Sequence, residues 1–174
     1  MMIETMNKIK DHWKDLELEK YDLIWETNKV DTEMINLWNN GVYLQDKEIN
    51  TALEIGCGIG DTAAFLSEKG IKTTGVDIHP PTIEKAKKKE KENLKFECVN
   101  FSDYEIGERV DFIYDNTLYQ NCVAMYEEKD IQAYLTKLKE VSKKGTLFFG
   151  NWMKWDKDLH EKNRSLPLGV HLQD

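Results

Sequence analysis

The chain has 174 residues, a formal net charge of −8 and a hydrophobic fraction of 40%. That length suits one domain with a buried core, and the composition excludes a disordered chain. The acidic balance disfavours a nucleic-acid partner, because phosphates are bound by clustered positive charge. The lysine-dense run 85–95 is interleaved with glutamates, so we expect it to be a solvated helix face.

The sequence also disfavours a membrane protein, a disulfide-bonded protein and a metal-binding protein. No apolar run is long enough to span a bilayer, and residues 1–20 are too charged for a signal peptide. Cys57, Cys98 and Cys122 are odd in number and widely spaced, which is typical of a cytoplasmic protein without disulfides. The four histidines have no ligand spacing with these cysteines, so we expect no metal site. Because no apolar run could span a bilayer, we expect no membrane partner either.

The sequence predicts a single domain with three parts. Residues 1–50 are polar and helical, and form an N-terminal extension or lid. They include a short helix around Met34, Leu37 and Trp38 that Asn39-Asn40-Gly41 ends. Residues 51–152 form the ligand-binding core, and residues 153–174 form a C-terminal tail.

Strands and helices alternate through the core. We expect strands at 51–55, 71–76, 94–99, 110–114 and 146–149, and helices at 62–69, 80–91 and 130–141. Asp61 is the expected N-cap of the first of these helices and Gly70 its C′ glycine. Such alternation needs crossover connections, so the fold class is α/β, a doubly wound parallel sheet covered on both faces.

We expect the ligand-binding residues beyond the carboxyl ends of the first two strands, where such sheets bind ligands. Gly56, Gly58 and Gly60 form a G-x-G-x-G loop, but Asp61 replaces the last glycine of the dinucleotide fingerprint. Asp77 closes the second strand, where a carboxylate can accept bonds from both hydroxyls of a ribose. Carboxylates in and beside the loop repel phosphates and suit a cation, so the ligand is a ribose-bearing molecule without a pyrophosphate.

At these residues the chain resembles a known family. Leu53-Glu-Ile-Gly-Cys-Gly-Ile-Gly-Asp61 and Thr74-Gly-Val-Asp-Ile78 are similar to the first two motifs of class I S-adenosylmethionine-dependent methyltransferases. The resemblance covers residues 51–152 and is closest to the thiopurine methyltransferase-like branch. It implies a Rossmann-like, mainly parallel sheet of order 3-2-1-4-5, with S-adenosyl-L-methionine as cofactor and S-adenosyl-L-homocysteine as product.

The resemblance also implies roles for the first two motifs. The three glycines match the loop beneath the methionine part of the cofactor, and Glu54 matches the acid that orders this loop. Asp77 matches the ribose-binding acid, and Ile78 matches the apolar residue against the adenine. In the resembling branch an N-terminal tryptophan covers the site, and Trp25 is the preferred match, although core packing explains it equally well.

Later motifs are less regular. Asn100, followed by Phe101, stands where the family has an acid that receives the adenine amino group, and Asp103 is a competing candidate. Asp111 matches a structural acid at the start of the fourth strand. Asp115 lies at the carboxyl end of that strand, where the methyl group would point, as a cofactor-binding residue and as a candidate base, a pocket carboxylate or a structural one. Asn116-Thr117 replaces the prolines of the D/N-P-P-Y signature, which disfavours a DNA base as acceptor.

Several other residues have two readings. Trp13 and Tyr21, with Trp25, could form a lid over the cofactor and acceptor, or belong to the core. Tyr119, Trp152 and Trp155 could line an acceptor pocket, but core packing is the favoured interpretation. Cys57, Cys98 and Cys122 are expected to be plain core residues, with Cys57 in the tight loop. His79 is expected to be an exposed residue near a helix start rather than a base.

The C-terminal segment departs from the family's seven-stranded sheet. Residues 151–174 hold no two β-rich runs separated by a turn, so we expect the sixth and seventh strands to be absent and the chain to be truncated. The fifth strand would then offer an apolar edge, so we expect the chain to form a homodimer or swap segments through this edge, or else to be unusually labile.

The leading function is methyl transfer to a small-molecule acceptor such as a thiol, a metalloid or a similar soft nucleophile. In-line transfer from a sulfonium needs mainly proximity and orientation. The alternatives are a cofactor-binding domain without turnover, because of the truncation, and an NAD-dependent oxidoreductase. The missing glycine of the dinucleotide fingerprint argues against the oxidoreductase.

Overall fold

The computed structural model describes residues 28–41, 48–116 and 128–151. The first elements are α2 (Thr32–Asn40), β1 (Thr51–Ile55), α3 (Asp61–Glu68), β2 (Lys72–Asp77) and α4 (Pro80–Lys87). They are followed by β3 (Leu94–Cys98), the 3₁₀ turn η2 (Phe101–Asp103), β4 (Val110–Asn116), α6 (Glu128–Val141) and β5 (Ser142–Asn151). The expected order of the strands is confirmed: β3-β2-β1-β4-β5, with every neighbouring pair parallel.

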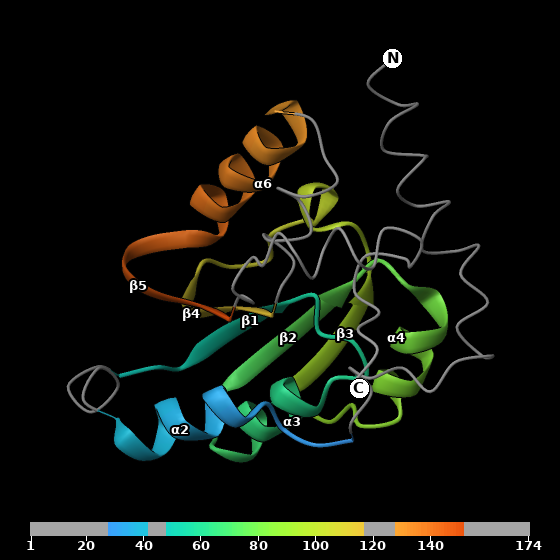
Figure 1. Ribbon diagram of the computed structural model, residues 1–174, viewed down its shortest axis with the longest axis vertical. Coiled ribbons are helices and arrows are strands. Elements are labelled where there is room, and N and C mark those ends of the chain that lie inside the picture. The colour runs from blue at the N-terminus through green and yellow to red at the C-terminus, as the bar shows by residue number, and fades with distance from the viewer. Residues whose placement is uncertain (1–27, 42–47, 117–127, 152–174) are drawn as a thin grey trace, which may run out of the picture.

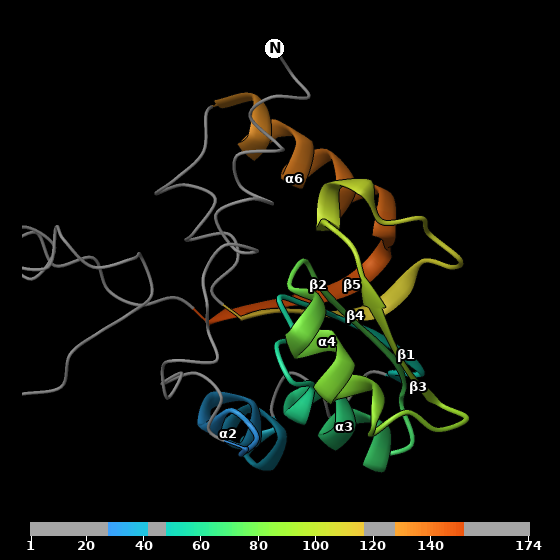
Figure 2. The same ribbon diagram turned by 90° about the vertical axis from the view of Figure 1, so that its right-hand side faces the viewer.

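Helices cover both faces of the sheet, as the alternation predicts. Helices α2, α3 and α4 lie on one face, whereas α6 and η2 lie on the other (Figures 1 and 2). Successive residues of β1 point to opposite faces. Leu53 and Ile55 therefore pack with Tyr134 of α6, and Ala52 packs with Met34 of α2 and Leu66 of α3. This double burial explains why β1 reads as a continuous apolar run.

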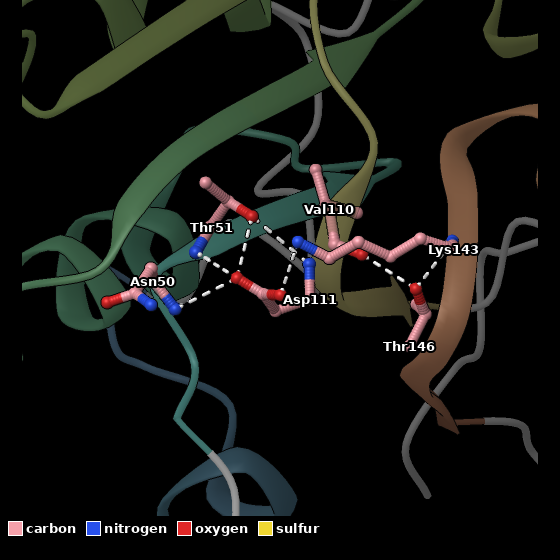
Figure 3. Close-up of polar contacts among 6 residues, drawn as sticks. All are labelled: Asn50, Thr51, Val110, Asp111, Lys143 and Thr146. Atoms are coloured by element: carbon pink, nitrogen blue, oxygen red, sulfur yellow. Dashed lines mark hydrogen bonds and ion pairs between the residues drawn. The ribbon is translucent and has the colours of Figure 1, made fainter.

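The amino end of the sheet is held by Asp111 (Figure 3). One carboxylate oxygen of Asp111 accepts from the N–H groups of Asn50 and Thr51 and from the Thr51 hydroxyl, at 2.9–3.0 Å. The other oxygen pairs with Lys143 Nζ at 2.6 Å. Burial alone would raise the pKa of Asp111. The bonds to its carboxylate, of which the one from Lys143 has the largest effect, outweigh burial and lower the pKa to about 2. The structural role expected for Asp111 is confirmed, and it ties β4 to the starts of β1 and β5.

Three local expectations are wrong. The N-cap of α3 is Gly60 and not Asp61, because Gly60 adopts the left-handed φ of +79° from which the helix starts. Helix α4 ends at Lys87 rather than near residue 91. Strand β5 begins at Ser142, before the expected start at 146, and Gly145 within it has a φ of +92°.

Two further predictions concern the edge of the sheet and membrane-spanning helices. β5 is the last strand on its side of the described sheet, and residues 152–174, where the sixth and seventh strands would be sought, lie outside it. Across 28–41, 48–116 and 128–151 there is no helix with the length and apolar character that a bilayer crossing requires.

Candidate functional site

The glycine loop follows β1 and turns sharply into α3. Gly56, Gly58 and Gly60 all have positive φ angles, of +71°, +53° and +79°. Residues with a Cβ rarely adopt this region, so the glycine spacing is a requirement of the turn. The N–H groups of Gly56 and Cys57 donate to the carbonyl of Val76 at 2.9 and 3.0 Å, which docks the loop onto the end of β2.

Asp77 lies at the carboxyl end of β2, directly beside this loop. One of its carboxylate oxygens accepts from the Gly58 N–H and the other from the His79 N–H, both at 2.9 Å. Burial raises the pKa of Asp77, and the bonds from His79 and Gly58 partly offset that rise. Each carboxylate oxygen has two acceptor positions, so Asp77 keeps acceptor capacity for a ligand while it fixes the loop.

Glu54 is the second-last residue of β1, directly before the glycine loop. Its side chain is 1% exposed, and its Oε2 atom has no hydrogen-bond partner within the described part of the chain. Burial raises the pKa of Glu54 well above its usual value, a bond from the Ala63 N–H lowers it, and the nearby carboxylates of Asp77, Asp31 and Asp61 raise it further. A buried, unpartnered carboxyl oxygen among other acids is suited to a positively charged ligand.

The predicted adenine side of the site is built by β2, β3 and η2. Ile78 is half-buried after β2, and Asn100 is half-buried at the N-cap of η2. The Asn100 Oδ1 atom accepts from the N–H and the hydroxyl of Ser102, at 3.2 and 3.1 Å. Phe101 is 3% exposed and its ring packs edge-on against Tyr134, 5.2 Å between centroids. Asp103, the competing acid, is exposed at the end of η2.

Asp115 is fully buried at the carboxyl end of β4. Its Oδ2 atom accepts a hydrogen bond from the hydroxyl of Tyr134, which comes from α6. The bond links the sheet to the helix that covers this face. Of the three readings of Asp115, this contact favours the structural one.

Two further expectations are wrong, and one is confirmed. His79 is 7% exposed rather than solvent-exposed, since its ring Nδ1 contacts the Thr82 hydroxyl and its N–H binds Asp77. Cys98 is exposed rather than core, because it ends β3, the outermost strand on that side. Cys57 is buried as expected, and burial raises the pKa of its thiol well above the usual value.

The structure also brings together residues that the sequence pattern did not single out. The lysine-dense run 85–95 predicts a solvated face, yet Lys89 within it binds the glycine loop. Asp31, before α2, accepts from the amide of Asn151 at the end of β5, at 3.0 Å. No local spacing could have indicated either contact, because 28 residues separate Lys89 from Asp61 and 120 separate Asp31 from Asn151.

Other sequence-based candidates lie outside the described residues. They are Trp13, Tyr21, Trp25, Tyr119, Cys122, Trp152 and Trp155. Within residues 28–41, 48–116 and 128–151, no three His, Cys, Asp or Glu side chains are grouped so that they could hold a metal ion.

A protein-family model and several solved structures are similar to this chain. A family model described as a methyltransferase domain matches residues 53–148. No curated protein matches the chain significantly. A structure described for the conversion of a disulfide bond into a thioacetal group during echinomycin biosynthesis has a TM-score of 0.56 and 25% identity, over 68% of this chain and 47% of that one.

Two further solved structures are similar in fold. A TehB-like S-adenosylmethionine-dependent methyltransferase from Corynebacterium glutamicum has a TM-score of 0.54 and 18% identity, over 86% of this chain and 73% of that one. A methyltransferase from Thiobacillus denitrificans, in complex with S-adenosyl-L-homocysteine, has a TM-score of 0.53 and 20% identity, over 70% and 48%. The chain thus spans about half the length of the echinomycin and Thiobacillus proteins.

Proposed function

The chain belongs to the methyltransferase domain family, and from this premise we propose that it is an S-adenosylmethionine-dependent methyltransferase acting on a small molecule. The observation that carries the proposal is the joint placement of the glycine loop, Asp77 and Glu54 at the carboxyl ends of β1 and β2. The S-adenosyl-L-homocysteine in the Thiobacillus structure supports the choice of cofactor.

The residues at this site suit the cofactor in charge and in shape. The unpartnered Oε2 atom of Glu54 is buried beside three other carboxylates, an environment that a cationic ligand stabilises. Among the described residues, a Cβ added at Gly58 would meet only the Thr82 methyl group within 4 Å, at 3.9 Å, so these residues leave room for a ligand to approach the loop backbone. When bound, S-adenosylmethionine supplies an activated methyl group on a sulfonium.

In this proposal the chain's own residues bind the cofactor and orient it for transfer. Asp77 holds the ribose hydroxyls, and Ile78 and Asn100 border the adenine, with Phe101 supporting this side from the core. The glycine loop and Glu54 hold the methionine part. Such positioning can contribute about 7–11 kcal/mol to a bimolecular reaction. Trp25 as a lid remains part of this proposal.

The acceptor is proposed to be a thiol, a metalloid or a similar soft nucleophile. The echinomycin structure supports this class, because its described reaction takes place at sulfur. A soft nucleophile needs no strong base, which is consistent with the bond that Asp115 already receives from Tyr134. Asp115→Asn keeps an acceptor for that bond and removes the charge, so an unchanged kcat in this variant would eliminate Asp115 as the base.

Calorimetry with S-adenosyl-L-homocysteine and NADH tests the proposal first. Binding of the first ligand alone is expected, and binding of NADH alone would favour the oxidoreductase. Methyl transfer from labelled S-adenosylmethionine to thiols, halides and metalloid anions is the second assay. Binding of the cofactor without transfer to any acceptor would favour the alternative of a cofactor-binding domain without turnover.

Two parts of the proposal concern the whole protein. A cytoplasmic location rests on the spacing of the three cysteines. A homodimer through the edge of β5 stays a prediction, and light scattering on the full chain tests it.

A further inference from the structure

Lys89 lies just beyond the end of α4, and its ammonium group reaches the glycine loop. Its Nζ atom donates to the backbone carbonyl of Ile59 at 2.7 Å and to the Asp61 carboxylate at 2.6 Å. The Lys89 side chain is 32% exposed and that of Asp61 is 21% exposed, so both charges are partly shielded from water. Charge-assisted bonds of this kind are stronger than neutral ones.

The contact completes the anchoring of the loop. Gly56 and Cys57 are held by Val76, and Gly58 is held by Asp77, all from the end of β2. The Gly60 N–H donates back to Cys57 within the loop. The Ile59 carbonyl is held by Lys89, so each residue from 56 to 60 has a hydrogen bond to its backbone within the described part of the chain.

The turn between α4 and β3 supplies a second support to the same loop. The Glu90 carboxylate accepts from the Phe96 N–H at 2.9 Å, which ties this turn to the middle of β3. The buried Phe96 ring then fills the space beside Gly60, where an added Cβ would lie 2.4 Å from it. Lys89 and Glu90 are neighbours in sequence. One short turn therefore binds the Ile59 carbonyl through Lys89 and the Phe96 N–H through Glu90.

We propose that Lys89 is a positioning residue for cofactor binding: its bonds to Ile59 and Asp61 hold the glycine loop in its ligand-binding shape. The inference rests on the proposed function, because it assumes that this loop binds S-adenosylmethionine. Lys89 acts through the loop backbone and through the first residue of α3, and it needs no contact with the cofactor itself.

Calorimetry with S-adenosyl-L-homocysteine on the full chain tests this role. Lys89→Met keeps most of the packing and removes both bonds, so we expect Kd to rise about tenfold, which corresponds to 1.4 kcal/mol. Lys89→Arg can donate to both oxygens, so affinity is expected to return most of the way to wild type. Asp61→Asn leaves the bond to Ile59 in place and is expected to weaken binding less than Lys89→Met.

Amide hydrogen exchange at Gly58 and Gly60 is the second readout, and it needs no ligand. Exchange at both residues is expected to accelerate in Lys89→Met and to be normal in Lys89→Arg. Lys72→Met is the matched control, since Lys72 pairs with Glu108 on the exposed surface and should change neither readout. Wild-type affinity together with unchanged exchange in Lys89→Met would overturn the inference. Absence of binding by the wild-type chain would overturn the proposed function instead, and exchange in the unliganded chain would still decide the role of Lys89.

Discussion

The carboxylate of Asp77 accepts the N–H of Gly58 at 2.9 Å, so the acid at the end of β2 also fixes the loop at the end of β1. The two halves of the proposed cofactor site are therefore mechanically coupled. A ligand that engages Asp77 meets a loop already in place, which reduces the ordering cost of binding. Substitutions of Asp77 should consequently affect more than the ribose contact.

Asp77→Ala is expected to weaken S-adenosyl-L-homocysteine binding by about 1.5–3 kcal/mol, the range for hydrogen bonds to a charged group. The loss has two sources, the ribose contact and the bond to Gly58. Asp77→Asn keeps one acceptor for Gly58 and should lose less. Calorimetry measures both variants, and wild-type affinity in Asp77→Ala would remove Asp77 from the site.

Glu54→Gln is expected to stabilise the unliganded chain at neutral pH. Burial, above all, raises the pKa of Glu54 in the folded state, so the folded chain holds this proton more tightly than the unfolded chain. The stabilisation by that proton is present below the unfolded pKa of about 4.3 and is lost as the pH rises through the raised value. Glutamine is neutral at every pH and does not incur this loss.

Urea unfolding of wild type and Glu54→Gln across the acid-to-neutral range measures the effect. The variant's advantage in free energy of unfolding should be smallest near pH 4 and should grow as the pH rises. Parallel pH profiles for the two proteins would contradict the burial of an uncompensated carboxylate at Glu54. The same substitution should weaken cofactor binding, because the cationic ligand loses its partner.

Local patterns were enough to predict the architecture. The apolar run of β1, the glycines after it and the amphipathic α6 each predicted their element, and the strand order agreed with the resemblance. The motif Thr74-Gly-Val-Asp-Ile78 likewise placed Asp77 at the carboxyl end of β2, beside the loop. These features depend on neighbours in sequence, which explains why a single chain reveals them.

The predictions were wrong where contacts between residues far apart in sequence determine the local structure. Asp61 has the chemistry of an N-cap, but the left-handed Gly60 takes that position and Asp61 pairs with Lys89. His79 is polar and precedes two prolines, yet Thr82 and Asp77 satisfy it in a buried turn. Charge and polarity along the sequence do not reveal which polar groups meet in the folded chain.

Asp111→Asn is expected to destabilise the fold at neutral pH, because a folded pKa of about 2 against an unfolded value of about 3.9 corresponds to about 2.6 kcal/mol, which solvent screening reduces. Because the folded pKa is lowered, the stabilisation is present above about pH 4 and is lost as the pH falls toward about 2. Urea unfolding at both ends of that range measures it. Lys72→Met, which breaks an exposed ion pair, is the control and should change stability little. An acid-insensitive difference between wild type and Asp111→Asn would contradict the assignment.

Gly60→Ala and Gly70→Ala separate backbone strain from steric overlap. Gly60 and Gly70 have nearly the same φ angle, +79° and +85°, so an alanine at either position carries a similar strain of about 1–2 kcal/mol. At Gly70 an added Cβ meets no atom of the described residues within 4 Å, whereas at Gly60 it would lie 2.4 Å from the buried Phe96 ring. Overpacking of that kind typically adds about 1–3 kcal/mol.

We therefore expect Gly60→Ala to lose more stability than Gly70→Ala, and to lose cofactor affinity as well, because the loop must shift to clear the ring. Thermal unfolding and calorimetry with S-adenosyl-L-homocysteine measure the two effects. Adding Phe96→Leu to Gly60→Ala removes the ring atoms that the new methyl group would meet, so the double variant should recover part of the affinity that Gly60→Ala loses, while the backbone strain remains. Equal losses of stability in the two alanine variants, with affinity retained in both, would show that Phe96 does not constrain the glycine loop.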